Sequence, residues 1–162
     1  MWLRDLDLSR CRRLTHLTFV FRRESPDLFL AELPSFLSRL SEGGIEEVHF
    51  HTDADEDVGL GWNTIDWPRM DEALALLHKR RPSLLVIFHF SSLRPAEYGK
   101  PDVVGPLTQR IPVALGAGMR VASILSSVLI SLPDEPEDLE RKFRVLPDEQ
   151  HWLTVAAQQS VI

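Results

Sequence analysis

The sequence predicts an α/β fold in which strand–helix units repeat along the chain and stack as a short solenoid with parallel strands. Three segments share the apolar alternation of short, half-buried strands, and they read L-x-x-L-x-F at residues 14–19, I-x-x-V-x-F at 45–50 and L-x-x-F-x-F at 85–90. Segments of helical periodicity lie between them, which favours parallel strands joined by right-handed crossovers. Strand patterns that start at residues 14, 45 and 85 recur at a spacing typical of repeat architectures.

The second strand pattern indicates that one face of the sheet is in contact with water. Glu46, Glu47, His49 and His51 alternate with its apolar positions. Strands of a doubly wound sheet are buried on both faces and are more continuously apolar. The pattern therefore favours the solenoid. The third strand, at 85–90, is more apolar, so a small doubly wound α/β sheet stays open as the alternative.

The first helix is predicted after residues 25–27, where Ser-Pro-Asp supplies a capping residue, a first-turn proline and a favourable first-turn acid. Leucines follow at helical spacing, and Gly43-Gly44 ends the pattern. Pro34 lies within it and predicts either a kink or a later start of the helix.

The second helix has the clearest pattern. Asp66 is the predicted N-cap, basic residues follow at 79–81, and the apolar stripe consists of Trp67, Met70, Leu74 and Leu77. A weaker helical pattern spans 103–111, and a fourth strand is predicted to open at residues 119–121 after the turn Gly116-Ala117-Gly118.

Composition excludes several classes of protein. The chain has 162 residues and a formal net charge of -6, which argues against general binding to nucleic acid or to a membrane surface. Its longest apolar stretch, 121–132, is shorter than the roughly 20 residues of a membrane span. Cys11 is the single cysteine, so a disulfide scaffold is excluded, and an intracellular location, cytoplasmic or nuclear, is expected.

These patterns resemble the leucine-rich-repeat-like regions of F-box-like hypothetical proteins from mushroom-forming (basidiomycete) fungi. The resemblance covers roughly residues 2–121 and is carried by a Trp-x-x-x-Asp helix start at 67–71, by Pro-x-Leu at 82–84 and by the three strand patterns. It implies a leucine-rich-repeat-like α/β domain, which we place over 1–132, because the acidic, proline-bearing run at 133–138 predicts a separate, partly ordered segment over 133–162. It also implies recognition of a partner protein, as in the substrate-recognition part of an F-box-like ubiquitin-ligase adaptor.

The sequence departs from that family in one respect, because no F-box segment that would dock the ligase is found in it. The chain is therefore expected to begin within a repeat. One alternative that follows is a truncated remnant without independent function.

A histidine cluster is the most suggestive constellation. If the strand patterns align, His49 and His89 occupy equivalent positions on neighbouring strands, with Glu47 and His51 on the same side. Two histidines and a carboxylate suit zinc or iron, so a small metal-binding protein or enzyme using His49, His89 and Glu47 is a further alternative. The other reading is a set of polar residues on a solvated strand face.

Other motifs give weaker signals. The acidic run at 53–57 resembles the start of a calcium loop, but it lacks the glycine and glutamate that complete one. Gly59-Leu60-Gly61 lacks the third glycine of a dinucleotide site, and there is no G-x-S-x-G elbow.

The leading interpretation is a non-enzymatic protein–protein interaction module that presents its strand face to a protein partner. No catalytic residue, cofactor or metal ligand is assigned in it, and neither nucleic acid nor membrane is expected as a partner. The predicted contact residues lie on the wet strand face or in the loop after it, where tryptophan is typical of binding hot spots. They are Thr18, Glu47, His49, His51, His89 and Trp62.

Overall fold

The computed structural model describes the parts of the chain that form the sheet and the helices packed on it. The described residues are 3, 6, 8, 11, 13–21, 27–40, 44–53, 65–95, 101–131, 142–145 and 148–153. Trp62 and the acidic run at 54–57 lie outside them.

Strands and helices alternate along the described chain. In order they are β1 (His16–Phe21), α1 (Asp27–Arg39), β2 (Glu47–Asp53), α2 (Trp67–Arg80), β3 (Leu85–Pro95), α3 (Val104–Arg110), α4 (Pro112–Gly116), β4 (Arg120–Ser131), β5 (Lys142–Val145) and β6 (Glu149–Leu153).

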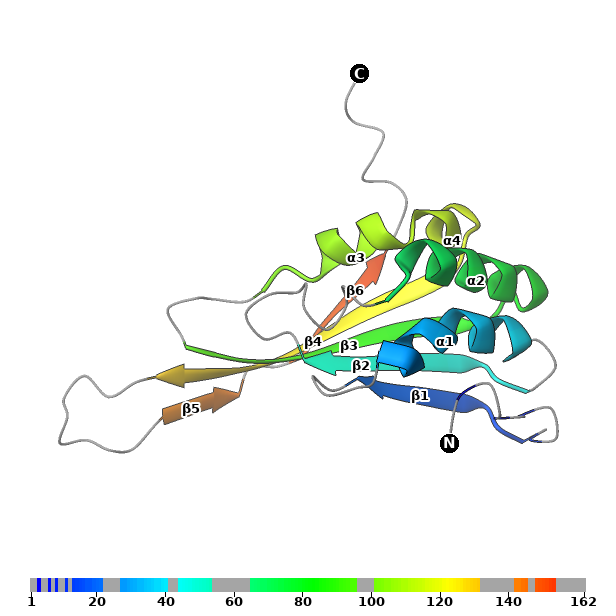
Figure 1. Ribbon diagram of the computed structural model, residues 1–162. Helices are drawn as coiled ribbons and strands as arrows, with labels where there is room; N and C mark the ends of the chain where they lie inside the picture. The colour runs from blue at the N-terminus through cyan, green and yellow to red at the C-terminus, as the bar shows by residue number, and fades with distance from the viewer. Residues whose placement is uncertain are drawn as a thin grey trace, which may run out of the picture.

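The sheet is mixed and mostly parallel. Strands β1, β2, β3 and β4 are parallel neighbours in the order of the sequence, and β5 and β6 both pair antiparallel with β4. Helices α1, α2, α3 and α4 lie above the same face of this sheet (Figure 1). The predicted α/β class with parallel strands is confirmed. A doubly wound sheet has helices on both faces and a strand order that reverses. Here the described helices between β1 and β4 lie on one face, and these strands follow the order of the sequence.

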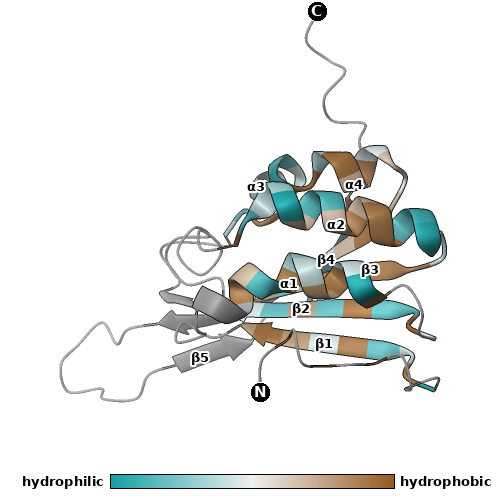
Figure 2. Cartoon of the chain, turned by 45° about the vertical axis from the view of Figure 1, so that its right-hand side comes forward, coloured by the Kyte–Doolittle hydropathy of each residue, from teal (hydrophilic) through white to brown (hydrophobic). Residues whose placement is uncertain are grey.

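Strand hydropathy explains this layered arrangement. β2 alternates between hydrophobic and hydrophilic residues, and β1 does so up to its hydrophobic end at Phe19, Val20 and Phe21 (Figure 2). Successive side chains of a strand point to opposite faces, so alternation buries one face under the helices and leaves the other polar. Val48 and Phe50 are fully buried, whereas Glu47, His49 and His51 between and beside them are only partly buried.

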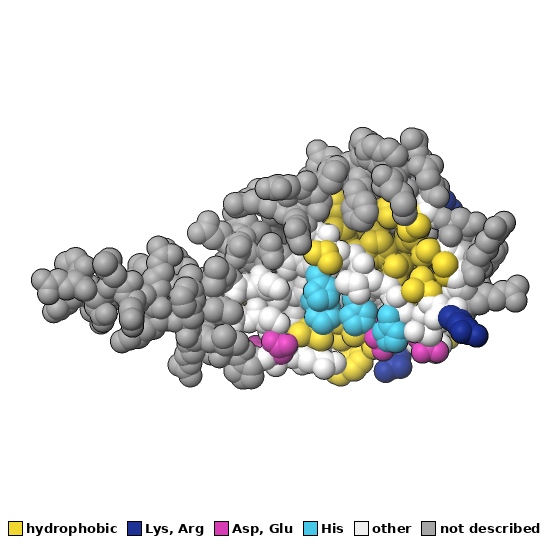
Figure 3. Space-filling model, turned by 90° about the horizontal axis from the view of Figure 1, so that it is seen from below, with side chains coloured by type: hydrophobic (Ala, Val, Ile, Leu, Met, Phe, Trp, Pro, Cys, Tyr) yellow, Lys and Arg dark blue, Asp and Glu magenta, His cyan; other side chains and the backbone are white. Residues whose placement is uncertain are grey.

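The face of the four parallel strands on which none of the described helices lies is called the open face below, and Ile87 and Ala122 are buried on it. It is formed by the side chains of the alternate positions 16, 18 and 20 in β1, 47, 49 and 51 in β2, 85, 87 and 89 in β3, and 120, 122 and 124 in β4. Histidine side chains form a row across it, beside hydrophobic side chains (Figure 3).

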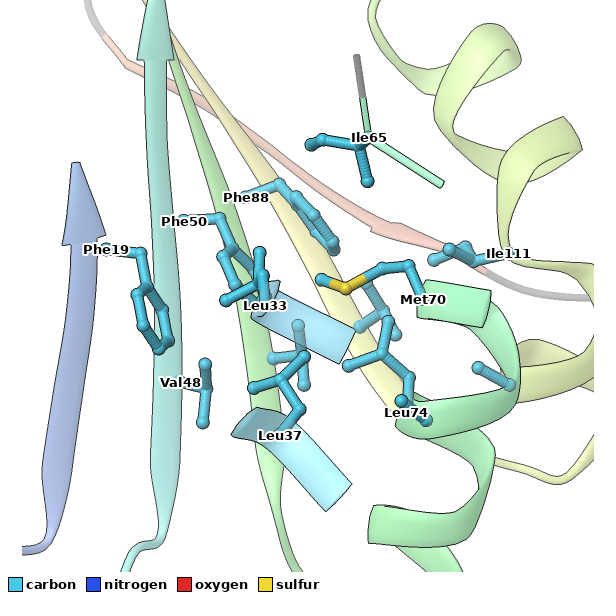
Figure 4. Close-up of a cluster of buried hydrophobic side chains, with 14 of the residues drawn as sticks. Phe19, Leu33, Leu37, Val48, Phe50, Ile65, Met70, Leu74, Phe88 and Ile111 are labelled. Atoms are coloured by element: carbon cyan, nitrogen blue, oxygen red, sulfur yellow. The ribbon is translucent and has the colours of Figure 1, made fainter. Parts of the chain in front are cut away.

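The buried face is held in register by a ladder of phenylalanines. Phe19, Phe50 and Phe88 are direct neighbours across β1, β2 and β3, with ring centroids 5.4 Å and 4.9 Å apart. Their rings point toward the helices, where leucines of α1 and α2 and Met70 of α2 pack on them (Figure 4). Stacked aromatic pairs add about 0.5–1.5 kcal/mol beyond their buried area.

This ladder sets a register between β2 and β3 that differs from the predicted one. The apolar patterns aligned Phe50 with Phe90, whereas the structure pairs Phe50 with Phe88. The predicted pairing of β1 with β2, in which Thr18 lies beside His49, is confirmed. A slip of two residues keeps every side chain on its predicted face, because the period of a strand is two.

The two long helices follow their apolar stripes. α1 runs through Pro34 rather than beginning there, and its neighbours Leu33 and Leu37 are fully buried. Their packing offsets the backbone hydrogen bond that proline cannot donate. α2 begins as predicted, with Asp66 Oδ1 accepting a hydrogen bond from the Arg69 N–H at 3.2 Å.

Gly118 makes the turn from α4 into β4 with a φ of +88°, a left-handed conformation that glycine adopts without steric cost. The predicted turn at 116–118 is therefore confirmed, and β4 begins at Arg120. Within the segment 133–162, the described strands β5 and β6 extend the same sheet.

Candidate functional site

The open face brings together five of the six predicted contact residues. Thr18 is on β1, Glu47, His49 and His51 are on β2, and His89 is on β3, all with side chains on the same side of the sheet. Their strands carry them there because each occupies a polar position of an alternating pattern.

The three histidines His49, His51 and His89 are called the His cluster. His51 lies directly opposite His89 in the register, and their rings stack with centroids 4.1 Å apart and planes 14° apart. His49 lies diagonally, yet its Nδ1 is only 3.0 Å from His89 Nε2. The sequence predicted His49 opposite His89, and the register of the sheet places His51 there instead.

Glu47 connects the His cluster to β1. Its Oε2 accepts a hydrogen bond from His49 Nε2 at 2.9 Å and lies 3.3 Å from His16 Nε2. His16 was missed by the sequence analysis. Its position two residues before Thr18 on the same strand is the signal that could have identified it, because alternate residues share a face.

Burial and neighbouring histidines disfavour the charged forms of His51 and His89. Burial, and then the neighbouring His51 and His49, lower the pKa of His89 to about 4, against a small opposing effect of Asp148. Burial, and then His49, also lower the pKa of His51 below its usual 6.5. Both imidazoles are therefore neutral at pH 7.

For Glu47, in contrast, the surroundings favour the charged form of the side chain. The pKa of its carboxyl is lowered below 4.5, and the largest cause is the hydrogen bond from His49. Desolvation raises this pKa, whereas the positive charges that His16 and His49 carry when protonated lower it further. The site therefore combines the Glu47 carboxylate with the neutral imidazoles of His51 and His89. Such a set can accept hydrogen bonds and can offer nitrogen lone pairs to a metal ion.

A second group of candidate contact residues lies at the other end of the open face. Trp152 of β6 pairs with Ala122 of β4, which places its ring on this face, and its side chain is 51% exposed. The Arg120 guanidinium lies over that ring, 5.6 Å from its centroid. Sequence analysis missed this pair, because only the antiparallel return of β6 brings residue 152 beside residue 120.

The helical side of the molecule carries a separate hollow of about 590 Å³ between α2 and α4. Exposed aliphatic side chains of Leu76 and Val113 line it, with Glu72 and Lys79 at its rim. His78 also lines it, but the described residues of this lining do not form a group of three potential metal ligands. The open face is therefore the better candidate site.

Comparison with protein-family models, with curated proteins and with solved structures gave no match to this chain. The described helices are all too short or too polar to cross a membrane.

Proposed function

We propose that this protein is a non-enzymatic interaction module that binds a partner protein through the open face. The observation that carries the proposal is the placement of α1 to α4 on a single side of a largely parallel sheet. Parallel sheets are ordinarily covered on both faces, so a face without helices among the described elements is a surface that a partner would cover.

The composition of the open face supports recognition of a protein. Val20 is 56% exposed at one edge, and the Trp152–Arg120 pair lies toward the other. Tryptophan and arginine are enriched among residues that dominate binding energy. Between them, Glu47 and the His cluster supply polar groups that select a partner by hydrogen bonds and charge.

We further propose that the strand–helix units form a short leucine-rich-repeat-like solenoid. The sequential order of β1 to β4 and the helices on one side support this. In the fungal F-box-like proteins that the sequence resembles, such a region would recognise the substrate of a ubiquitin ligase. The partner proposed here is accordingly a protein, bound by the strand face.

The test is a quantitative capture experiment with three forms of the tagged full chain, in buffer with a chelator. The open-face variant carries alanine at Glu47, His49 and His89. The control carries three alanines on the opposite side of the molecule, at Glu72, Leu76 and Lys79 of α2. Circular dichroism and urea unfolding first establish that all three are folded.

We expect a specific partner to be retained by the wild type and the α2 control and lost by the open-face variant. Purified partner should then bind the wild type directly, with affinity reduced at least tenfold by the open-face changes. Equal retention by the open-face variant, or a loss caused equally by the α2 control, contradicts the proposal. So does the absence of any specific partner.

A further inference from the structure

The His cluster has a geometry that hydrogen bonding on a solvated face does not require. Each of its three side chains offers one ring nitrogen, and these nitrogens all lie within 4.8 Å of one another. Two neighbouring parallel strands bring them together, with His51 directly opposite His89 and His49 on the same face two residues earlier. The positions are therefore fixed by backbone pairing rather than by a loop.

The nitrogens lie almost as close together as the ligands of a small metal ion. Two nitrogens bound to one tetrahedral Zn²⁺ at about 2.0–2.1 Å are about 3.3 Å apart. The nitrogens of His49 and His89 are 3.0 Å apart, and no pair in the cluster exceeds 4.8 Å. The rings stack with planes 14° to 21° apart, so the side chains would rotate to point all three lone pairs at one ion.

The positions of the protons on the histidine rings are also compatible with metal binding. His49 Nε2–H donates to Glu47, so the neutral ring keeps a lone pair on Nδ1, which faces His89 Nε2 at 3.0 Å. The proton between these two nitrogens then belongs to His89. For His89 to bind a metal ion through Nε2, this proton would move to its Nδ1, so that the ring stays neutral and offers the Nε2 lone pair.

Glu47 has the role of an outer carboxylate in this arrangement. Histidines that bind metals usually donate their second N–H to a carboxylate or carbonyl, which orients the ring and raises its basicity. The Glu47–His49 bond of 2.9 Å is such a contact.

We propose that His49, His51 and His89 bind one divalent transition-metal ion of the zinc type on the open face. Three imidazole ligands select zinc and its soft neighbours over magnesium or calcium, which require oxygen ligands. The fourth position faces the solvent side of the sheet and takes water or a ligand group from a bound molecule. The metal site goes beyond the proposed interaction function and does not depend on it.

The experiment uses the full chain after treatment with a chelator and desalting. Zn²⁺ is titrated by calorimetry, and Co²⁺ is titrated by visible absorption, where intense d–d bands report tetrahedral coordination. We expect one saturable site per chain for each metal. Single alanine variants of His49, His51 and His89 should each lose the site.

Two further variants separate ligation from folding. Glu47→Gln keeps the cluster and alters only the outer carboxylate, so about a 10- to 100-fold loss of affinity is expected. His151→Ala is the matched control, because His151 is also a strand histidine near a glutamate, with its Nε2 3.9 Å from Glu149, but lies outside the His cluster. It should bind both metals like the wild type.

A measurement on the unaltered chain guards against variants that fail to fold. Zn²⁺ should shift the imidazole NMR signals of the His cluster and leave those of His78 and His151 in place. Lack of saturable binding, shifts confined to other histidines, or wild-type affinity in the three ligand variants would each overturn the proposal. Because partner capture is performed with a chelator, failure of the metal site and failure of the interaction function are distinguishable.

Discussion

Asp71 on α2 holds the N-terminus of α4, and its removal gives the sharpest test of the packing described above. Its side chain is 3% exposed and accepts hydrogen bonds from the backbone N–H groups of Val113 and Ala114, both at 2.8 Å. α4 has a proline at its first position, and Ile111 at its N-cap makes no side-chain capping bond. A carboxylate from another helix therefore caps both of these N–H groups.

The cost of Asp71→Ala follows from these contacts. A hydrogen bond to a charged group contributes about 1.5–3 kcal/mol, and a buried donor left without a partner adds to the loss. Val113 is 54% exposed, so water can replace its lost bond, whereas Ala114 is fully buried. We therefore expect the free energy of unfolding to fall by about 3 kcal/mol, which is the lower end of the range for two hydrogen bonds to a charged group.

Urea unfolding followed by circular dichroism measures this loss, and the m-value should be unchanged. Asp66→Ala is the matched control, because Asp66 is an exposed aspartate that accepts one bond within its own helix. Its loss should cost about 1 kcal/mol. A cost for Asp71→Ala that does not exceed that of Asp66→Ala would refute the capping argument.

Two further predictions concern the two faces of the sheet. In metal-free protein, the contribution of neutral His89 to the free energy of unfolding should be fully present above pH 6.5 and should be lost as the pH falls toward 4. The reason is that burial, and then His51 and His49, lower the folded-state pKa of His89 to about 4, with Asp148 opposing. The unfolded chain therefore binds the proton more readily across that range. Urea midpoints at several pH values check this, and a His89→Gln variant with an unchanged pH profile would count against it. Phe50→Ala should cost about 3–5 kcal/mol in urea unfolding, because the fully buried ring stacks on both of its neighbours. A loss below about 2 kcal/mol would mean that the ladder does not anchor the sheet.

Periodicity in the sequence was enough to predict which side chains share a face. The alternation in β2 separated Val48 and Phe50 from Glu47, His49 and His51, and the structure has them on opposite sides of the sheet. The α2 stripe and its Asp66 cap were predicted for the same reason. These features depend on residues close in the chain, where the periods of two and 3.6 residues apply.

The pairing of β2 with β3 could not be derived in the same way. β3 carries phenylalanine at both 88 and 90, so either register sets an aromatic ring beside Phe50 and keeps every side chain on its face. In the structure Phe50 pairs with Phe88, while Phe90 is buried in the same core. That pairing places His51, rather than His49, opposite His89.

The sequence by itself therefore determined the α/β class, the parallel strand–helix order and the common face of Thr18, Glu47, His49, His51 and His89. Only the tertiary structure decided the register of the His cluster, the approach of Trp152 to Arg120 and the capping of α4 by Asp71. The physical reason is that each of these contacts joins residues about 30 or more positions apart. Their geometry depends on how whole elements pack, which no local pattern encodes.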